Sequence, residues 1–198
     1  MSLTLQLAVA AAVVGYTGAQ AIFGVGLLVF GTPTLLLLGL PFDQVLAYLL
    51  PCSIVISGVQ VGQGRGPWLE GWVRRRLDAL LVLLGLVHGA SNLGGGILAW
   101  IVGSLHRDKH EIRRQIAFCY GLMALTQLAT LLVTHPPAVD LGLCVLLPAL
   151  ALASYFLIGQ RMFRMTSTAV YHQALTGLIA AFGILLVLAA WHPDARRG

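Results

Sequence analysis

The sequence predicts an all-α protein that crosses a membrane several times, and three observations support this fold class. First, 58% of its 198 residues are hydrophobic and only 10% are charged, whereas a soluble domain carries roughly 25% charged residues. Second, the only acidic or basic side chain before Arg65 belongs to Asp43. Third, the apolar residues form long runs, and two of these runs contain several glycines. Together these features predict a polytopic transmembrane domain with broken helices.

Composition also excludes several kinds of partner and site. The net charge is +5, but the basic residues form short clusters between apolar runs, as in cytoplasmic loops of membrane proteins. We therefore expect a lipid bilayer as partner and no nucleic acid. Cys52, Cys119 and Cys144 lie inside apolar runs, which argues against a disulfide framework or a metal site. No cofactor is expected. Because the segment 1–12 lacks a positive region, we expect it to remain in the mature protein.

Four apolar runs predict one spanning helix each, because about 20 apolar residues cross the hydrocarbon core of a bilayer. These runs are 43–62, 115–134, 141–159 and 168–191. Pro51 is expected to kink the first of them.

The other two runs have lengths that fit neither one nor two spanning helices. Run 77–105 would form a helix about 43 Å long, against a hydrocarbon core of about 30 Å. Run 3–41 is longer still and is interrupted by several glycines and by Pro33. Both predict a discontinuous helix or a re-entrant hairpin, which a bilayer tolerates only where protein or a water-filled cavity satisfies the freed backbone groups.

A constant offset of 70 residues relates the two broken runs and predicts a repeat. At this offset three glycines of one run fall on glycines of the other: Gly15, Gly24 and Gly26 on Gly85, Gly94 and Gly96. The predicted domain covers 1–198, with units at 3–62 and 77–134, a basic loop at 63–76 and a C-terminal helix pair at 141–191. The alternative is six plain spans whose glycines serve only close helix packing.

The basic loops predict the orientation of the two units. The loops 63–76 and 106–114 both contain lysine or arginine, whereas the loop 135–140 contains neither. Both basic loops can be cytoplasmic only if run 77–105 enters the membrane and returns to the same side. One hairpin plus one span is an odd number of crossings, so the second unit begins on the opposite side and the repeat is inverted. Inverted repeats with broken helices are typical of secondary transporters.

The glycine motifs resemble those of a known family of permeases, the sulfite exporter TauE/SafE family. The similar stretches are GYTGAQAIFGVG at 15–26, GLP at 39–41, HGASNLGGG at 88–96, and Gly159 and Arg161 before the last apolar helix. The resemblance implies transport of sulfite, sulfonates or other small sulfur-containing or organic anions across a bacterial inner membrane. The chain is shorter than expected for this family, and the first copy has Gly-Val-Gly where the family has three glycines. Two alternatives follow for a shortened member of the family: its substrate has changed, or it works only as a homo-oligomer.

An anionic substrate must be held by neutral donors, because no lysine or arginine lies in the middle of a predicted span. Backbone N–H groups at the N-termini of half-helices can serve, and glycine lets a ligand approach them closely. The candidate substrate-binding glycines are Gly24, Gly26, Gly94, Gly95 and Gly96. The alternative for each glycine is close helix packing.

Polar side chains gather at the two breaks, where they are costly in lipid unless they face a partner or a cavity. The candidate substrate contacts are Thr17, Gln20, His88, Ser91 and Asn92. Ser91 or Asn92 could instead cap the following half-helix, and His88 either couples proton movement to transport or packs as a hydrogen-bonded residue. The predicted pathway-lining side chains are Ser53, Ser57, Thr126 and Gln127. Their alternative role is hydrogen bonding to their own helix backbone.

Two other classes of function stay open. Ser91 and His172 resemble the dyad of a rhomboid-like intramembrane serine protease, although Asn92 stands where that family has glycine. A structural membrane subunit that uses glycines for helix association is the second alternative. We expect the protein to be a secondary transporter, or permease, that moves a small anion by alternating access, and not an enzyme.

Overall fold

The computed structural model describes residues 1–63, 85, 94–134 and 139–191, and every regular element within these residues is a helix. The longer helices are α1 (Leu3–Phe23), α3 (Phe42–Gly62), α6 (Lys109–Thr134), α7 (Leu141–Ser154) and α9 (Thr168–Trp191). The shorter ones are α2 (Leu27–Leu37), α5 (Gly94–Leu105), the π-helical turn η1 (Tyr155–Gly159) and α8 (Gln160–Met165). The expectation of an all-α protein is confirmed for this part of the chain.

The first glycine-rich run is broken once, between α1 and α2. Gly24 has φ 78° and Gly26 has φ 153°, backbone conformations that residues with a side chain rarely adopt. Gly15 and Gly18 lie inside α1, and Gly31 and Pro33 lie inside α2. The run therefore forms two helices rather than one, and the glycines that separate α1 from α2 are Gly24 and Gly26.

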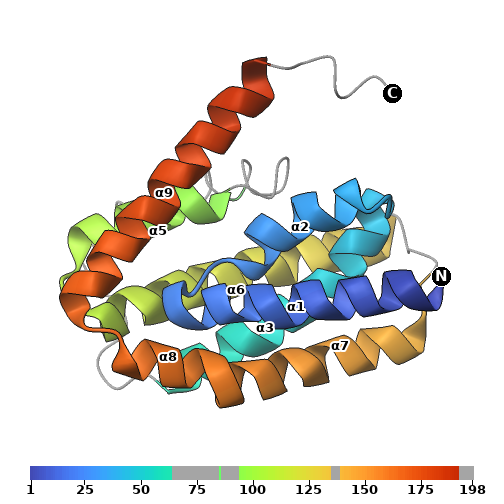
Figure 1. Ribbon diagram of the computed structural model, residues 1–198, viewed down its shortest axis with the longest axis horizontal. Coiled ribbons are helices and arrows are strands. Elements are labelled where there is room, and N and C mark those ends of the chain that lie inside the picture. The colour runs from blue at the N-terminus through green and yellow to red at the C-terminus, as the bar shows by residue number, and fades with distance from the viewer. Residues whose placement is uncertain (64–84, 86–93, 135–138, 192–198) are drawn as a thin grey trace.

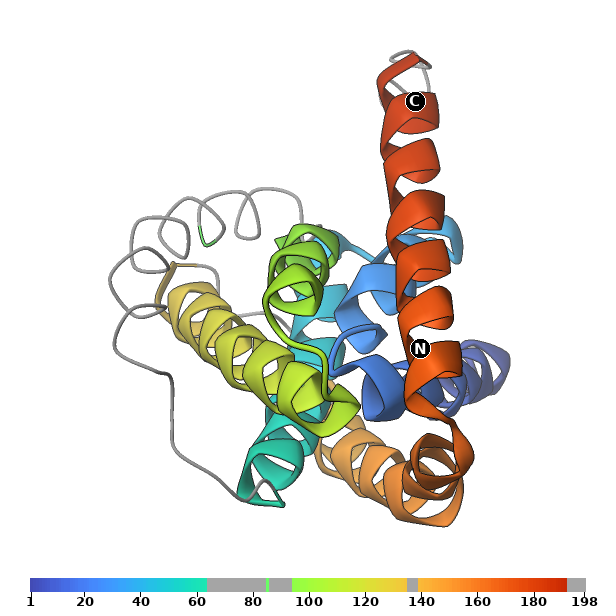
Figure 2. The same ribbon diagram turned by 90° about the vertical axis from the view of Figure 1, so that its left-hand side faces the viewer.

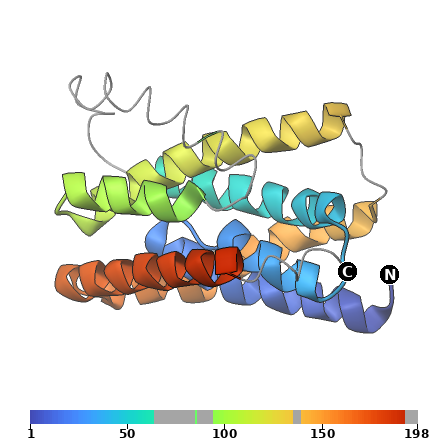
Figure 3. The same cartoon turned by 90° about the horizontal axis from the view of Figure 1, so that it is seen from above.

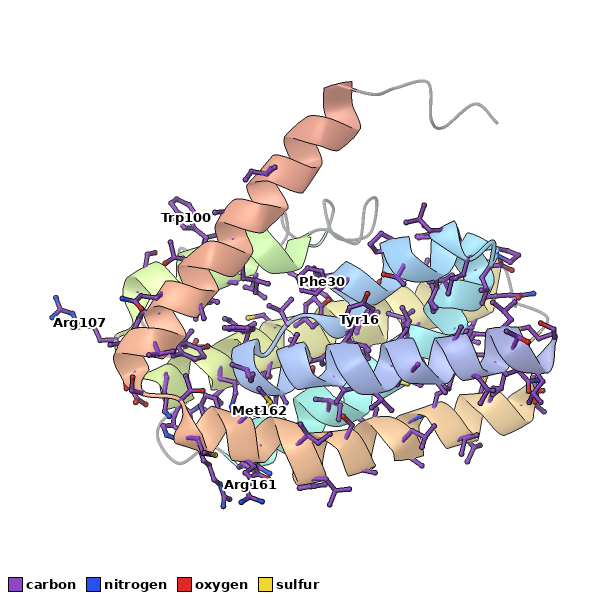
Figure 4. All side chains as sticks on the ribbon, viewed as in Figure 1. Tyr16, Phe30, Trp100, Arg107, Arg161 and Met162 are labelled. Carbon is purple, nitrogen blue, oxygen red and sulfur yellow. The ribbon has the colours of Figure 1, made fainter. Side chains whose placement is uncertain are left out.

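Contacts between α1 and α2 hold the two helices together as a hairpin. The rings of Tyr16 and Phe30 stack with their centroids 5.9 Å apart, and Figure 4 shows both side chains between the two helices. The Tyr16 hydroxyl also lies 2.8 Å from Oγ1 of Thr34. An aromatic pair with a polar link at its rim fixes the angle at which α2 folds back.

Helices α3 and α6 pack along each other at the centre of the bundle and run in opposite directions (Figure 1). The view from above shows the same relation, with both helices beside α1 and α7 (Figure 3). Helix α7 runs parallel to α3, as two hydrogen bonds show. The N–H of Asp140 donates to the hydroxyl of Tyr48 near one end, and the hydroxyl of Tyr155 donates to Gln63 near the other. The shorter helices α2 and α5 also run in opposite directions.

Helix α9 contacts α5 and then leans away from the bundle, as two perpendicular views show (Figures 1 and 2). At this contact a Cβ on Gly103 would lie 2.9 Å from a methyl carbon of Leu175. A glycine on one helix against a leucine on the other allows the two backbones to approach closely.

Four helices within the described residues are long and apolar enough to cross a membrane: α1, α3, α6 and the continuous helix Leu141–Met165. Large apolar side chains such as Leu7, Leu125 and Leu157 are exposed on their surfaces, as expected where lipid is the solvent. All lysines and arginines of the described residues fall in 107–114 or 161–164. Both stretches lie at the same end of the bundle, where Figure 4 labels Arg107 and Arg161.

The predicted helix boundaries match the structure closely except before 115. The runs 43–62, 141–159 and 168–191 coincide with helices, and the second of these continues to Met165. The predicted loop 106–114 is wrong, because α6 begins at Lys109. Lys109, Arg113 and Arg114 are buried in its first turns. Helix α6 therefore carries fixed cations near its N-terminal end, although no lysine or arginine lies in its middle.

Candidate functional site

The break after α1 leaves backbone carbonyl groups without helical partners, since the last four C=O groups of any helix lack them. The N–H of Gly24 donates to the carbonyl of Gln20 at 2.8 Å. The side-chain amide of Gln60 donates to the same carbonyl at 2.8 Å and to that of Ala21 at 3.2 Å. Nη1 of Arg113 also donates to the Ala21 carbonyl, at 3.1 Å. Side chains from α3 and α6 thus replace the missing turn of α1.

The side chain of Gln20 ties the same helix end to the middle of α3. Its amide nitrogen donates to the carbonyl of Ser53 at 3.1 Å, to Oγ of Ser53 at 3.2 Å and to Oγ of Ser57 at 3.3 Å. All three side chains are buried. With Gln60 and Arg113 they form a connected group of polar side chains inside an apolar bundle, which we call the break cluster.

Arg113 supplies the break cluster with a positive charge. It is 6% exposed, its guanidinium carbon lies 3.7 Å from the ring centroid of Phe163, and no carboxylate among the described residues pairs with it. Lys109, one turn earlier on α6, lies above the same ring and donates to the carbonyls of Phe163 and Thr166. The C-terminal end of a helix carries partial negative charge, so cations at the ends of α1 and α8 stabilise both ends.

The start of α5 packs directly against the break between α1 and α2. Gly94, Gly95 and Gly96 are all buried. A Cβ on Gly95 would collide with the side chain of Val25 and would lie 3.1 Å from a methyl carbon of Val29. A Cβ on Gly24 would lie 2.7 Å from the backbone oxygen of Arg113. Close packing is therefore a confirmed role of Gly24 and Gly95, and it brings the two glycine motifs into contact.

Two buried polar atoms in this region have no hydrogen-bond partner among the described residues. They are Oγ1 of Thr17 and Oε1 of Gln60. Thr17 is fully buried and lies three residues before Gln20 on the same face of α1. An unsatisfied buried polar atom costs about 1–3 kcal/mol, so the region favours occupation by water or by a polar ligand.

The structure brings some predicted site residues together and separates others. Thr17, Gln20 and Gly26 lie at the break with Ser53 and Ser57 from α3. Thr126 and Gln127 line a different space, a cavity between α3 and α6 that also includes Asp43. The predicted substrate contacts of the second glycine-rich run, His88, Ser91 and Asn92, lie outside the described residues.

The backbone-bonding alternative is confirmed for one predicted pathway residue. Thr126 donates to the carbonyls of Leu122 and Met123 on its own helix. Ser53 and Ser57 accept hydrogen bonds from Gln20, which links them to another helix.

The serine-protease alternative gains no support from the described residues. His172 Nε2 lies 3.0 Å from the backbone oxygen of Arg107, and its proposed partner Ser91 lies outside the described residues. Cys52 is buried and donates its thiol hydrogen to the carbonyl of Tyr48 one turn earlier in α3, a packing role.

Sequence reasoning missed Gln60, Arg113 and Lys109. Gln60 follows Ser53 and Ser57 at helical spacing, so these three polar residues share one face of α3. Lys109 and Arg113 are four residues apart, which places both on one face of a helix. Assigning them to a loop concealed this spacing.

Comparison of the chain with protein-family models, with curated proteins and with solved structures finds no match. The resemblance to the sulfite exporter family thus stays an interpretation of the glycine motifs quoted above.

Proposed function

We propose that this chain is a secondary transporter that moves a small anion past the break cluster. The observation that carries the proposal is Arg113, a buried guanidinium without a carboxylate partner among the described residues, beside a helix break with unsatisfied polar atoms. A buried cation is costly unless it is paired. An anion at this position supplies the missing charge and accepts hydrogen bonds from the guanidinium.

The arrangement of the helices supports alternating access between two inverted units. Helix α2 runs opposite to α5, and α3 runs opposite to α6 (Figure 1). The offset of 70 residues relates the same two pairs in the sequence. The start of α5 touches the break between α1 and α2 through Gly95 and Val25. In inverted-repeat transporters the substrate binds where discontinuous helices meet.

The charge distribution supports one orientation in the membrane. The described lysines and arginines all lie at the end where α3 and α8 finish and α6 begins, and we assign this end to the cytoplasm of a bacterial inner membrane. The family resemblance and the charge of Arg113 support a sulfite, a sulfonate or another small organic anion as the substrate class.

Anion flux into proteoliposomes tests the proposal. Purified chain is reconstituted, and uptake of labelled sulfite, thiosulfate, sulfoacetate and taurine is measured for the wild type, Arg113→Gln and Arg161→Gln. Arg161 is exposed at the same end of the bundle, so its substitution removes the same charge without changing the break cluster. We expect flux of at least one anion in the wild type and in Arg161→Gln, and loss of about tenfold or more in Arg113→Gln.

Further variants separate substrate binding from folding. Arg113→Lys keeps the charge but loses the fork of N–H donors, so it should fold and transport with lower apparent affinity. Gln20→Ala and Asn92→Ala test the neutral contacts at the two breaks. Equal flux in the wild type, Arg113→Gln and Gln20→Ala would refute the site. Absence of flux for every anion tested, with helicity intact, would favour the structural-subunit alternative.

A further inference from the structure

A cavity of about 590 Å³ is lined by the first turns of α3, the C-terminal half of α6 and Gly85. Small-molecule sites have volumes of roughly 300–1,000 Å³, so this cavity is large enough for an organic ligand. Arg113 and Gln127 are 14 residues apart on α6, about 21 Å at 1.5 Å per residue. The cavity is therefore separate from the break cluster.

Three threonines on one face of α6 line the cavity: Thr126, Thr130 and Thr134. Each hydroxyl donates its hydrogen to a carbonyl of its own helix, Thr130 to Thr126 at 2.9 Å and Thr134 to Thr130 at 2.8 Å. Thr126 does the same toward Met123 at 2.9 Å. A hydroxyl whose hydrogen is committed can only accept a further hydrogen bond. The three oxygens therefore present acceptors to a ligand.

Asp43 on α3 and Gln127 on α6 add further acceptors to the lining of the cavity. Asp43 lies in the first turn of α3 and forms no ion pair with a lysine or arginine in the described part of the chain. Oε1 of Gln127 is buried and has no donor among the described residues. The remaining described lining is largely apolar, with Phe42, Leu46 and Met123 contributing side chains.

We propose that this cavity binds a primary alkylammonium ion. The ammonium group carries three N–H donors and one positive charge, which complement the carboxylate of Asp43 and the threonine and glutamine oxygens. The alkyl chain contacts Phe42, Leu46 and Met123, so that apolar surface is removed from water on binding. This inference concerns a second ligand and does not depend on the proposed anion transport.

The test uses the full chain in detergent micelles with n-butylammonium chloride as the probe. Binding is measured by calorimetry and by the rise in unfolding temperature followed by circular dichroism. Tetramethylammonium chloride carries the same charge without N–H donors, and sodium chloride matches the ionic strength and the chloride concentration. We expect saturable binding of n-butylammonium, with an apparent affinity about tenfold or more above that of tetramethylammonium.

Two variants test whether Asp43 holds the ammonium group. Asp43→Asn removes the charge from the cavity and should weaken n-butylammonium binding by about tenfold or more. Asp140→Asn is the matched control, because Asp140 caps α7 through its Oδ1, an asparagine caps equally well, and Asp140 does not line the cavity. It should leave the affinity within about twofold.

Equal responses to n-butylammonium and tetramethylammonium, or the same weakening in Asp43→Asn and Asp140→Asn, would overturn the inference. Absence of any saturable response to n-butylammonium in the wild type would also overturn it. None of these results would bear on the proposed anion transport. The chloride concentration is the same in every binding measurement, and Arg113 is not substituted in any of these variants.

Discussion

Replacing Gly24 by alanine tests whether the helix break is held against α6 by backbone packing. Gly24 combines a left-handed conformation, φ 78°, with a close approach to α6, where a Cβ would lie 2.7 Å from the backbone oxygen of Arg113. Gly39 has a similar conformation, φ 84°, but no atom lies within 4 Å of the position of its Cβ. The pair Gly24→Ala and Gly39→Ala therefore separates the conformational cost from the collision.

The structure sets the expected magnitudes. Both alanines must adopt a left-handed conformation, which costs roughly 1–2 kcal/mol. Only the alanine at position 24 meets a backbone atom that cannot rotate away, and overpacking of this kind costs about 1–3 kcal/mol. We expect Gly24→Ala to lower the free energy of unfolding by about 2–5 kcal/mol and Gly39→Ala by about 1–2 kcal/mol.

Reversible unfolding in mixed micelles, with sodium dodecyl sulfate as denaturant and helicity as the signal, measures both changes. Equal destabilisation by the two alanines would show that α6 can shift away from the added Cβ without loss of stability. That result would refute the packing argument. A destabilisation confined to Gly39→Ala would refute the account of the break altogether.

Two further predictions follow from the same contacts. Gln60→Leu removes the donor to the carbonyls of Gln20 and Ala21, and we expect a loss of about 1–3 kcal/mol in the free energy of unfolding; an unchanged value in the same micelle titration would contradict it. Gly159→Ala places a Cβ against that of Ala21 on α1, whereas Gly177→Ala meets no atom within 4 Å. The first should destabilise by about 1–3 kcal/mol, and the second, inside α9, should stabilise by roughly 0.5–1 kcal/mol; the opposite order would contradict the packing of α1 on η1.

The sequence predicted the helices well because their signal is local. Apolar runs such as 43–62 coincide with helices, in this case α3, Phe42–Gly62, since the length of a spanning helix follows from the thickness of a bilayer. The glycines carried less information. Gly15 and Gly24 look alike in the sequence, yet only Gly24 takes a positive φ, because its conformation depends on the distant backbone of α6.

The candidate site was predicted in part for the same reason. Gln20 was singled out because a buried amide in an apolar run requires partners, and the structure supplies them in Ser53 and Ser57. Arg113 was missed because its neighbours Arg107 and Lys109 resemble a solvated basic loop. Its burial arises from Phe163, a residue 50 positions later, and no local pattern reports such a contact.

The carbonyl of Ala21 has a consequence for how the molecule can move. A carbonyl oxygen has two lone pairs, and here Gln60 of α3 and Arg113 of α6 each donate to it. The two central helices therefore share one acceptor on a third helix. Any sliding of α3 against α6 must release at least one of these donors, and a bond from a charged donor is worth about 1.5–3 kcal/mol. Under the proposed function, an anion that draws Arg113 away would leave the Ala21 carbonyl bonded to Gln60 of α3 alone. Anion binding and the relative motion of α3 and α6 would then be linked.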